Sequence, residues 1–237
     1  MTASLYSTPT RGTVSRIHPA APAVEPPFEL LACAGLSSGR ERVEQYIAGV
    51  FQAAWDARVL GFLPLLCSLE RDNTVLAALG LRSARHGPLF CEQYLQGSVT
   101  DAVDALNGGR SHRGDILELG NLAASQPGQG ALLYLLVTAA IHEAGIRYLI
   151  FAANRAVRVS ICRSGFTPQA ICPARPEKLG SAAGDWGRYY DGDPEVMIGD
   201  MALTHRQALS RPVMAAELTR YADTVSALAA VIRALAA

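Results

Sequence analysis

The chain has 237 residues, half of them hydrophobic, and its 21 basic and 21 acidic side chains give a formal net charge of zero. This length and composition suit one globular domain with a substantial core, and the balanced charge excludes a general attraction to nucleic acid or to an anionic membrane surface. The five cysteines show no paired spacing, which is typical of reduced, mostly buried thiols. With no secretory signal and no apolar run of about 20 residues, we expect a cytoplasmic protein without a membrane span.

Taken in chain order, the sequence predicts an arm, a mixed domain and a C-terminal helix. Residues 1–27 are rich in Pro, Ser, Thr and Ala, which is typical of a flexible or loosely docked arm. From Phe28 onward, apolar periodicity and Gly/Pro signals predict the following elements: a helix over 37–59, a β-hairpin turning at Asp72-Asn73, a short helix over 97–109, a strand over 115–125, a helix over 130–145, a strand over 146–154, a short helix over 155–165, a strand or extended segment over 166–174 and a helix over 211–237.

This order of elements predicts an α/β fold in which one mixed sheet carries helices on its faces. We expect the domain to cover residues 28–205 and a C-terminal helical segment to cover 206–237. That segment is Ala-rich with apolar periodicity, which suits packing on the domain or against a second copy in a homodimer.

A glycine-containing bend between a strand and a buried helix carries the first chemical signal. The bend is Gln126-Pro127-Gly128-Gln129-Gly130-Ala131. The first N–H groups of a helix have no partner within it and attract anions, and glycine lets a phosphate approach the backbone closely. The bend is neither a Walker A loop nor a dinucleotide-binding GxGxxG motif. It therefore predicts either a phosphate cradle or a turn that simply needs glycine.

The bend and its surroundings resemble the GNAT class, the Gcn5-related N-acetyltransferases. That class places a pyrophosphate loop of pattern Gln/Arg-x-x-Gly-x-Gly/Ala between its fourth strand and third main helix, and residues 126–131 resemble this loop with a shifted glycine. The resemblance implies a GNAT-like, mixed and mostly antiparallel central sheet with a splayed central strand pair and flanking helices.

A closer resemblance runs from about Val43 to Met201. The segments LFCEQYL, ILELGNLA, FAANRAVRVSICRSGFTP and WGRYYDGDPEVMIGDM look like the thermostable hemolysin family, which is similar to GNAT proteins and more distantly to acyl-homoserine lactone synthases. Asn121 stands where those synthases carry the arginine of a Glu-x-x-Arg strand motif, which argues against lactone synthesis. Ala131 and Leu132 stand where family members often have arginine, which weakens the expected grip on phosphate.

Two residues of the strand before the bend are candidates for the reaction itself. Glu118 alternates with Leu117 and Leu119, so its carboxylate can face an acyl site and take a proton from an amine; the alternative is a structural carboxylate bound to loop amides or to Arg113. Asn121 is a candidate for contacting the pantetheine arm of the donor or for capping the bend.

Further candidates come from four other segments. Glu92 could bind the acceptor amine and Tyr94 could close the pocket, or Glu92 could pair as a surface carboxylate with Arg82 or Arg85. Asn154, at the end of a strand, could contact the donor or cap the next helix. In the glycine-rich segment DWGRYYDGDP, Tyr189 could protonate the departing thiolate, while Trp186 and Tyr190 could cover the site.

The resemblance implies an N-acyltransferase that moves an acyl group, expected to be fatty, from an acyl-CoA or acyl-carrier-protein thioester to a small amine by direct attack. The thioester is a co-substrate, and no tightly bound cofactor and no metal are expected, since the histidines lack metal-ligand spacing. Backbone N–H groups near Leu119–Leu122 would polarise the thioester carbonyl. The alternatives are a non-catalytic acyl-thioester-binding or regulatory module on the same scaffold and, with less support, a cytolytic protein.

Overall fold

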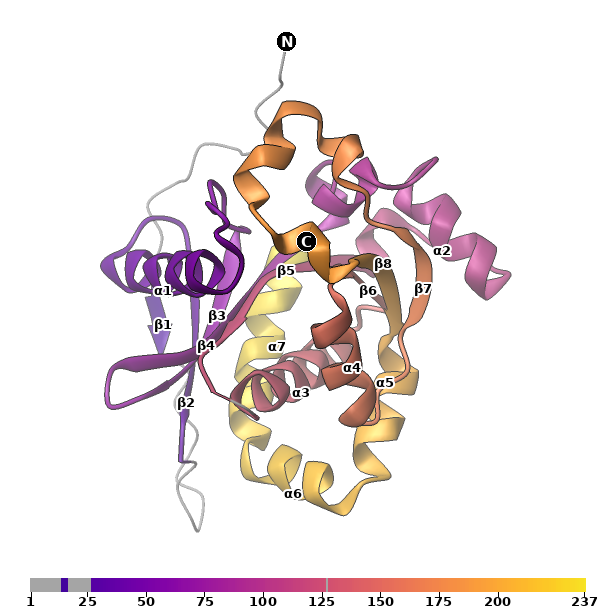
Figure 1. Ribbon diagram of the computed structural model, residues 1–237. Coiled ribbons are helices and arrows are strands. Elements are labelled where there is room, and N and C mark those ends of the chain that lie inside the picture. Colours follow the sequence, from indigo (N-terminus) through magenta and orange to yellow (C-terminus); the bar gives the residue numbers. More distant parts are fainter. Residues whose placement is uncertain (1–13, 17–26, 127) are drawn as a thin grey trace.

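The computed structural model describes residues 14–16, 27–126 and 128–237. One mixed sheet of eight strands crosses the molecule, and helices pack on both of its faces (Figure 1). The strand order is β1-β2-β3-β4-β5-β6-β8-β7, and every described strand pair is antiparallel except β5 with β6. The strands are β1 (Val14–Arg16), β2 (Glu29–Ala34), β3 (Leu65–Arg71), β4 (Thr74–Ser83), β5 (Ile116–Ala124), β6 (Tyr148–Ala153), β7 (Gln169–Pro173) and β8 (Glu195–Asp200).

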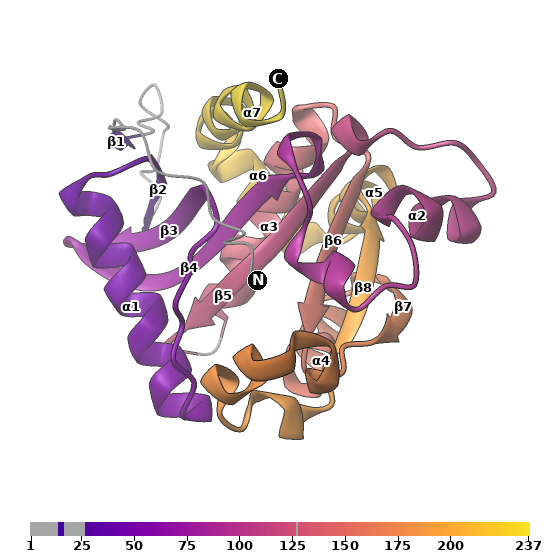
Figure 2. The same ribbon diagram turned by 90° about the horizontal axis from the view of Figure 1, so that it is seen from above.

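The helices divide between the two faces of the sheet (Figure 2). The α-helices are α1 (Ser38–Trp55), α2 (Val99–Asn107), α3 (Gln129–Glu143), α4 (Arg155–Arg163), α5 (Met201–Leu209), α6 (Pro212–Arg220) and α7 (Ala222–Ala236). Short 3₁₀ helices are η1 (Ala84–His86), η2 (Phe90–Gln93), η3 (Arg113–Asp115), η4 (Pro176–Trp186) and η5 (Tyr189–Gly192). Because successive side chains of a strand point to opposite faces, each face of the sheet has its own core.

The larger core lies between the sheet and the helices α3, α5, α6 and α7. It takes alternate residues of β3, for example Leu65, Cys67 and Leu69, while the intervening Leu66 belongs to a smaller core under α1. A third core lies on the same face of the sheet as α1. There η2 and α2 pack against sheet residues such as Ile116 and Ile150. Helix α3 is buried along nearly its whole length, as expected of a helix without a polar face.

Several predicted elements are confirmed with their local causes. The hairpin turns at Asp72 and Asn73, whose φ angles of 50° and 61° are those of the turn that suits the twist of two antiparallel strands. Helix α1 begins after Ser37, whose side chain accepts from the Arg40 N–H, and it ends at Trp55 because Asp56 adopts a left-handed conformation.

Other parts of the chain differ from the prediction. The strands β2 and β8 were not predicted. The expected single helix over 211–237 is two helices, broken at Tyr221. The break lets the Tyr221 ring be fully buried in the main core. Of the predicted arm, residues 14–16 form β1 on the edge of the sheet; the rest of residues 1–26 lies outside the described residues.

Candidate functional site

The two central strands separate after three residue pairs. β5 and β6 are paired in parallel only from Ile116–Tyr148 to Glu118–Ile150, whereas β5 stays paired with β4 as far as Ala124. From Leu119 onward, the edge of β5 that faces β6 therefore has no partner strand among the described residues. We call the diverging segments, 119–124 of β5 and 151–153 of β6, the V.

A β-bulge lies on the V. Between its pairs with Gly80 and Ala78 of β4, β5 contains an extra residue, and Asn121 there has a φ of 54°. A bulge increases the local twist and leaves a residue unpaired, and asparagine tolerates the left-handed conformation better than most residues. The bulge at Asn121 thus bends β5 away from β6 within the V.

The Asn121 side chain stabilises the bulge from within the protein. Its Oδ1 accepts from the Leu63 N–H at 2.9 Å and its Nδ2 donates to the Gly61 carbonyl at 3.3 Å. The expectation that Asn121 caps the glycine bend is wrong, because both ends of its amide bind the segment before β3. A contact with pantetheine stays a prediction.

The glycine bend at the end of β5 leads into an uncapped helix. Gly128, the N-cap of α3, has a φ of 87° and offers no side-chain cap, and the first bond within the helix runs from Leu132 N–H to the Gly128 carbonyl at 3.0 Å. A Cβ on Gly130 would lie 3.1 Å from the Ala124 Cβ, so glycine allows the helix to lie close to β5. The first turn of α3, residues 129–131, therefore lies beside β5 without a side-chain cap from Gly128; Pro127 lies outside the described residues.

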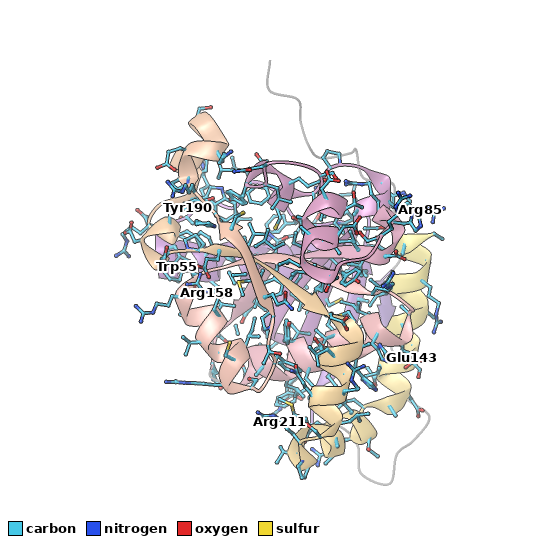
Figure 3. All side chains as sticks on the ribbon, turned by 90° about the vertical axis from the view of Figure 1, so that its right-hand side faces the viewer. Trp55, Arg85, Glu143, Arg158, Tyr190 and Arg211 are labelled. Carbon is cyan, nitrogen blue, oxygen red and sulfur yellow. The ribbon has the colours of Figure 1, made fainter. Side chains whose placement is uncertain are left out.

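Helix α4 borders a pocket at the end of β6. Asn154 caps this helix, its Oδ1 accepting from the Val157 N–H at 3.0 Å, as one of the two predicted roles requires. The pocket has a volume of about 500 Å³ and is lined by Trp55, Asn154, Arg155, Ala156, Val159, Arg163 and Gly192. Figure 3 shows Trp55, Arg158 and Tyr190 on this side of the molecule, away from Arg85 and Glu143.

Glu118 lies where β5 and β6 part and is 2% exposed. Its two carboxylate oxygens accept from the N–H groups of Phe90 at 3.0 Å and Cys91 at 2.6 Å, at the start of η2. Burial raises the pKa of Glu118, while these bonds, the Cys91 thiol and Arg82 on the neighbouring strand oppose the rise. The contacts match the structural alternative, loop amides, but not the suggested partner Arg113. The role of Glu118 as a base stays a prediction.

Glu92 pairs with Arg113 rather than with Arg82 or Arg85. The guanidinium contacts both carboxylate oxygens, at 2.7 and 2.9 Å, and the N–H groups of Leu89 and Val99 donate to the same oxygens. Burial pushes the pKa of Glu92 up, but these hydrogen bonds outweigh it and hold the pKa below its usual range. The contacts of Glu92 therefore stabilise η2 and α2, and its role in binding an amine stays a prediction.

Aromatic side chains from three distant segments meet over the V. We call them the aromatic cluster: Phe51 and Trp55 of α1, Phe90 and Tyr94 at η2, and Trp186, Tyr189 and Tyr190 at η4 and η5. The predicted site residues Tyr94, Trp186, Tyr189 and Tyr190 are thus brought together, while Phe51, Trp55 and Phe90 were not predicted. In the sequence, nothing around these three residues distinguishes them from ordinary core residues.

Hydrogen bonds tie the cluster to the sheet. The Tyr189 hydroxyl donates to the Ala152 carbonyl on β6 at 3.4 Å, and the Tyr94 and Tyr190 hydroxyls lie 2.5 Å apart. Burial raises the pKa of Tyr189, and it raises that of Tyr190 to about 12 although the bond to Tyr94 opposes it. All three hydroxyls, including that of Tyr94, whose pKa burial also raises, are protonated at neutral pH.

Comparison of the sequence with protein-family models decides the family. The model described as thermostable hemolysin matches residues 34–205. The chain belongs to the thermostable hemolysin family. A search of curated protein sequences found no match.

Solved structures similar to this family member include N-acyl amino acid and acyl-homoserine lactone synthases. The N-acyl amino acid synthase FeeM, from uncultured soil microbes, is 14% identical with a TM-score of 0.52, and the match covers 76% of this chain and 95% of FeeM. The acyl-homoserine lactone synthase LasI is 13% identical with a TM-score of 0.48, covering 73% of this chain and 89% of LasI. An acyl-CoA N-acyltransferase from Pseudomonas aeruginosa is 14% identical with a TM-score of 0.43, covering 73% and 99%. The predicted mixed, mostly antiparallel sheet with a splayed central strand pair is confirmed by the strand pairing, and FeeM shares this fold.

Two features are absent from the described part of this chain: a helix that could span a membrane and a group of side chains that could hold a metal ion. No helix there has the length and hydropathy to cross a membrane. Among the same residues, no group of three or more His, Cys, Asp and Glu side chains is arranged to hold a metal ion.

Proposed function

We propose that this member of the thermostable hemolysin family is an N-acyltransferase that moves an acyl group from an acyl-CoA or acyl-carrier-protein thioester to an amine. The observation that carries the proposal is the V: two central strands part beside a bulge, next to the uncapped N-terminus of α3 and the pocket along α4. FeeM, which shares the fold, is described as an N-acyl amino acid synthase, which supports this class of reaction.

Each part of the site has a place in the proposed binding of the donor. The N–H groups at residues 129–131 would bind the phosphates, since a helix N-terminus attracts anions, and Arg155 and Arg163 add positive charge at the pocket. The thioester carbonyl would lie in the V, where backbone N–H groups on the unpaired edge of β5, near 119–122, polarise it. The predicted contact of Asn154 with the donor rests on its position in the lining of the pocket.

The proposed reaction needs no covalent intermediate on the protein. The amine nitrogen attacks the carbonyl carbon, a C–N bond forms, the C–S bond breaks, and the thiol leaves. One proton leaves the amine nitrogen and one is taken up by the thiolate, so the reaction is balanced without a further reactant. The Tyr189 hydroxyl, protonated at neutral pH and bound to the V at Ala152, is our candidate for the acid, and Glu118 is our candidate for the base.

One observation favours a second function, a non-catalytic module that binds acyl thioesters. Both oxygens of Glu118 are held by backbone N–H groups, so the carboxylate is already occupied in this structure. These bonds leave lone pairs free, but they stabilise the charged carboxylate and so weaken it as a base. Turnover, rather than binding, separates the two functions.

The deciding experiment measures binding and thiol release in parallel. Acyl-CoA and acyl-carrier-protein thioesters of several chain lengths would be mixed with the protein and a panel of amines, including amino acids. Cys162 is exposed and would itself react with a thiol reagent, so the assay uses Cys162→Ser. Amine-dependent thiol release supports the transferase, and binding without release supports the module. Failure of every thioester to bind would overturn both.

A matched pair of variants tests the phosphate site. Gly130→Asp places a carboxylate at the N-terminus of α3, where we expect affinity for acyl-CoA to fall at least tenfold. Gly109→Asp adds the same charge where a Cβ meets nothing within 4 Å, and we expect it to bind as wild type. Equal affinities for the two variants would contradict a phosphate site at α3.

A further inference from the structure

Two rings of the aromatic cluster, Trp186 and Tyr189, each pack against four others. The Trp186 ring lies 5.3 Å from Tyr189, 5.5 Å from Phe90, 6.3 Å from Phe51 and 6.4 Å from Tyr190, measured between ring centroids. Each of these distances is in the range of direct ring packing. Trp186 therefore holds together rings that come from α1, η2 and η5.

Trp186 also packs against groups that are bound to both β5 and β6 where these strands part. Tyr189 on one side is bound to β6 through its hydroxyl and the Ala152 carbonyl. Phe90 on the other side is bound to β5, because its backbone N–H donates to Glu118. Since Trp186 packs against both rings, its indole lies beside the closed end of the V, between a ring bound at Ala152 and a segment bound at Glu118, the last β5 residue paired with β6.

The backbone around Trp186 fixes it in this position. The Asp185 carbonyl accepts from the Arg58 N–H at 2.6 Å, and the Arg188 N–H donates to the Trp55 carbonyl at 2.7 Å. Between them, Gly187 has a φ of 50°, and a Cβ there would lie 2.4 Å from the Trp55 and Asp56 carbonyl oxygens. The segment that carries Trp186 thus approaches the end of α1 as closely as only glycine allows.

The interior of the cluster suits hydrocarbon rather than an anion. The Tyr94 and Tyr190 hydroxyls bind each other, and the Tyr189 hydroxyl binds the backbone of β6. The carboxylate of Glu118 accepts from two backbone N–H groups, one of them that of Phe90. A carboxylate entering here would lose its hydration without gaining a cationic partner, whereas an alkyl chain would gain contact with aromatic rings.

We propose that Trp186 sets the longest acyl chain that the V accepts. The inference rests on the proposed function, because it assumes that a thioester carbonyl lies at the bulge of β5. A chain extending from that carbonyl through the V would meet the Trp186 indole, which closes the way between Tyr189 and Phe90. Trp186 would then be a specificity-determining residue, and Trp186→Ala would admit longer chains.

The test compares chain-length profiles of acyl-CoA binding and turnover for wild type and Trp186→Ala. For wild type, affinity should rise by about fourfold per methylene and then stop rising at a limiting length. For Trp186→Ala, the rise should continue for several more methylenes, and the preferred chain in turnover should lengthen with it. Trp186→Phe, which keeps a smaller ring, should shift the limit less and covers the case in which the alanine variant does not fold.

A control and three outcomes make the test decisive. Phe28→Ala removes a ring that packs on Arg71, outside the aromatic cluster, and should leave the profile unchanged. Identical profiles for wild type and folded Trp186 variants would overturn this inference and leave the proposed function intact. A change in KM for the amine without a change in the acyl profile would also overturn it, and would assign the cluster to the acceptor. Failure of all variants to bind any thioester would overturn the proposed function as well.

Discussion

Replacing Glu118 by glutamine tests the two roles that its position supports. The change keeps the size of the side chain and one oxygen acceptor, but it turns the second oxygen into an NH₂ group. In the structure both oxygens accept backbone N–H groups, at 3.0 Å from Phe90 and 2.6 Å from Cys91. The glutamine must therefore leave one of these buried donors without an acceptor.

The expected cost follows from those two bonds. A buried donor left unsatisfied costs about 1–3 kcal/mol, and hydrogen bonds to a charged group contribute about 1.5–3 kcal/mol. Removing the buried charge offsets part of this loss, because a carboxylate that is 2% exposed is poorly hydrated. We expect a net loss of about 2 kcal/mol in the free energy of unfolding at pH 7, or roughly 4–8 °C in Tm for a chain of this size.

Urea unfolding measures the structural role of Glu118, and thiol-release kinetics measure its role as a base. If Glu118 is the base, kcat per folded molecule should fall by about 10²–10⁴; if it only positions η2, kcat should stay within a few fold. Glu70→Gln is the control, since Glu70 of β3 is equally buried but binds Ser68 of the same strand and Arg42 of α1, away from the V. A Glu118→Gln protein as stable as wild type would refute the reasoning from the two N–H groups, whatever its activity.

The remaining predictions concern pH, backbone strain, an ion pair and thiol access. Because burial raises the folded-state pKa of Glu118, this residue should make the protein lose stability as pH rises from about 4.3, its unfolded value, through the folded pKa; Tm scans from pH 4 to 8 should show this component in wild type and not in Glu118→Gln. Gly128→Ala places a side chain at a φ of 87° and should cost about 1–2 kcal/mol, measurable in urea, whereas Gly109→Ala should not. Arg113→Met removes both contacts to Glu92 and should cost roughly 2 kcal/mol; an unchanged urea midpoint would show that the pair contributes nothing. With a thiol reagent, exposed Cys162 should react first in the native protein, and mass mapping that finds buried Cys91 labelled before it would contradict the packing around Glu118.

The sequence predicted the centre of the fold better than its edges. Alternation and the Asp72-Asn73 turn carry enough local information for the hairpin, and the bend before α3 has its own glycine signal. By contrast, β2 is a short apolar run directly after a Pro-rich segment, and β8 follows a glycine-rich one, so local patterns gave neither strand. Both become strands because a neighbouring strand supplies their hydrogen bonds, which is information that the local sequence does not contain.

For the candidate site too, features that depend on local sequence could be predicted, and contacts between distant segments could not. The placement of Glu118 on the strand before the glycine bend could be predicted, because it depends on neighbours along one strand. The pairing of Glu92 with Arg113, and the meeting of Phe51, Phe90 and Trp186, depend on segments far apart in the chain. These contacts depend on which segments the topology of the sheet brings together. A single sequence offers several partners of suitable chemistry for each residue.

The unpaired edge of β5 has a consequence for hydrogen exchange. A central strand of a sheet normally protects its amide protons on both edges, and its amides open only with the whole structure. Here the part of β5 beyond Glu118 is protected by β4 on one edge alone, so amides that point into the V should exchange faster than their position in the sheet implies. A ligand that binds there would take the place of the missing strand, and it would slow the exchange of those amides without changing that of the hairpin.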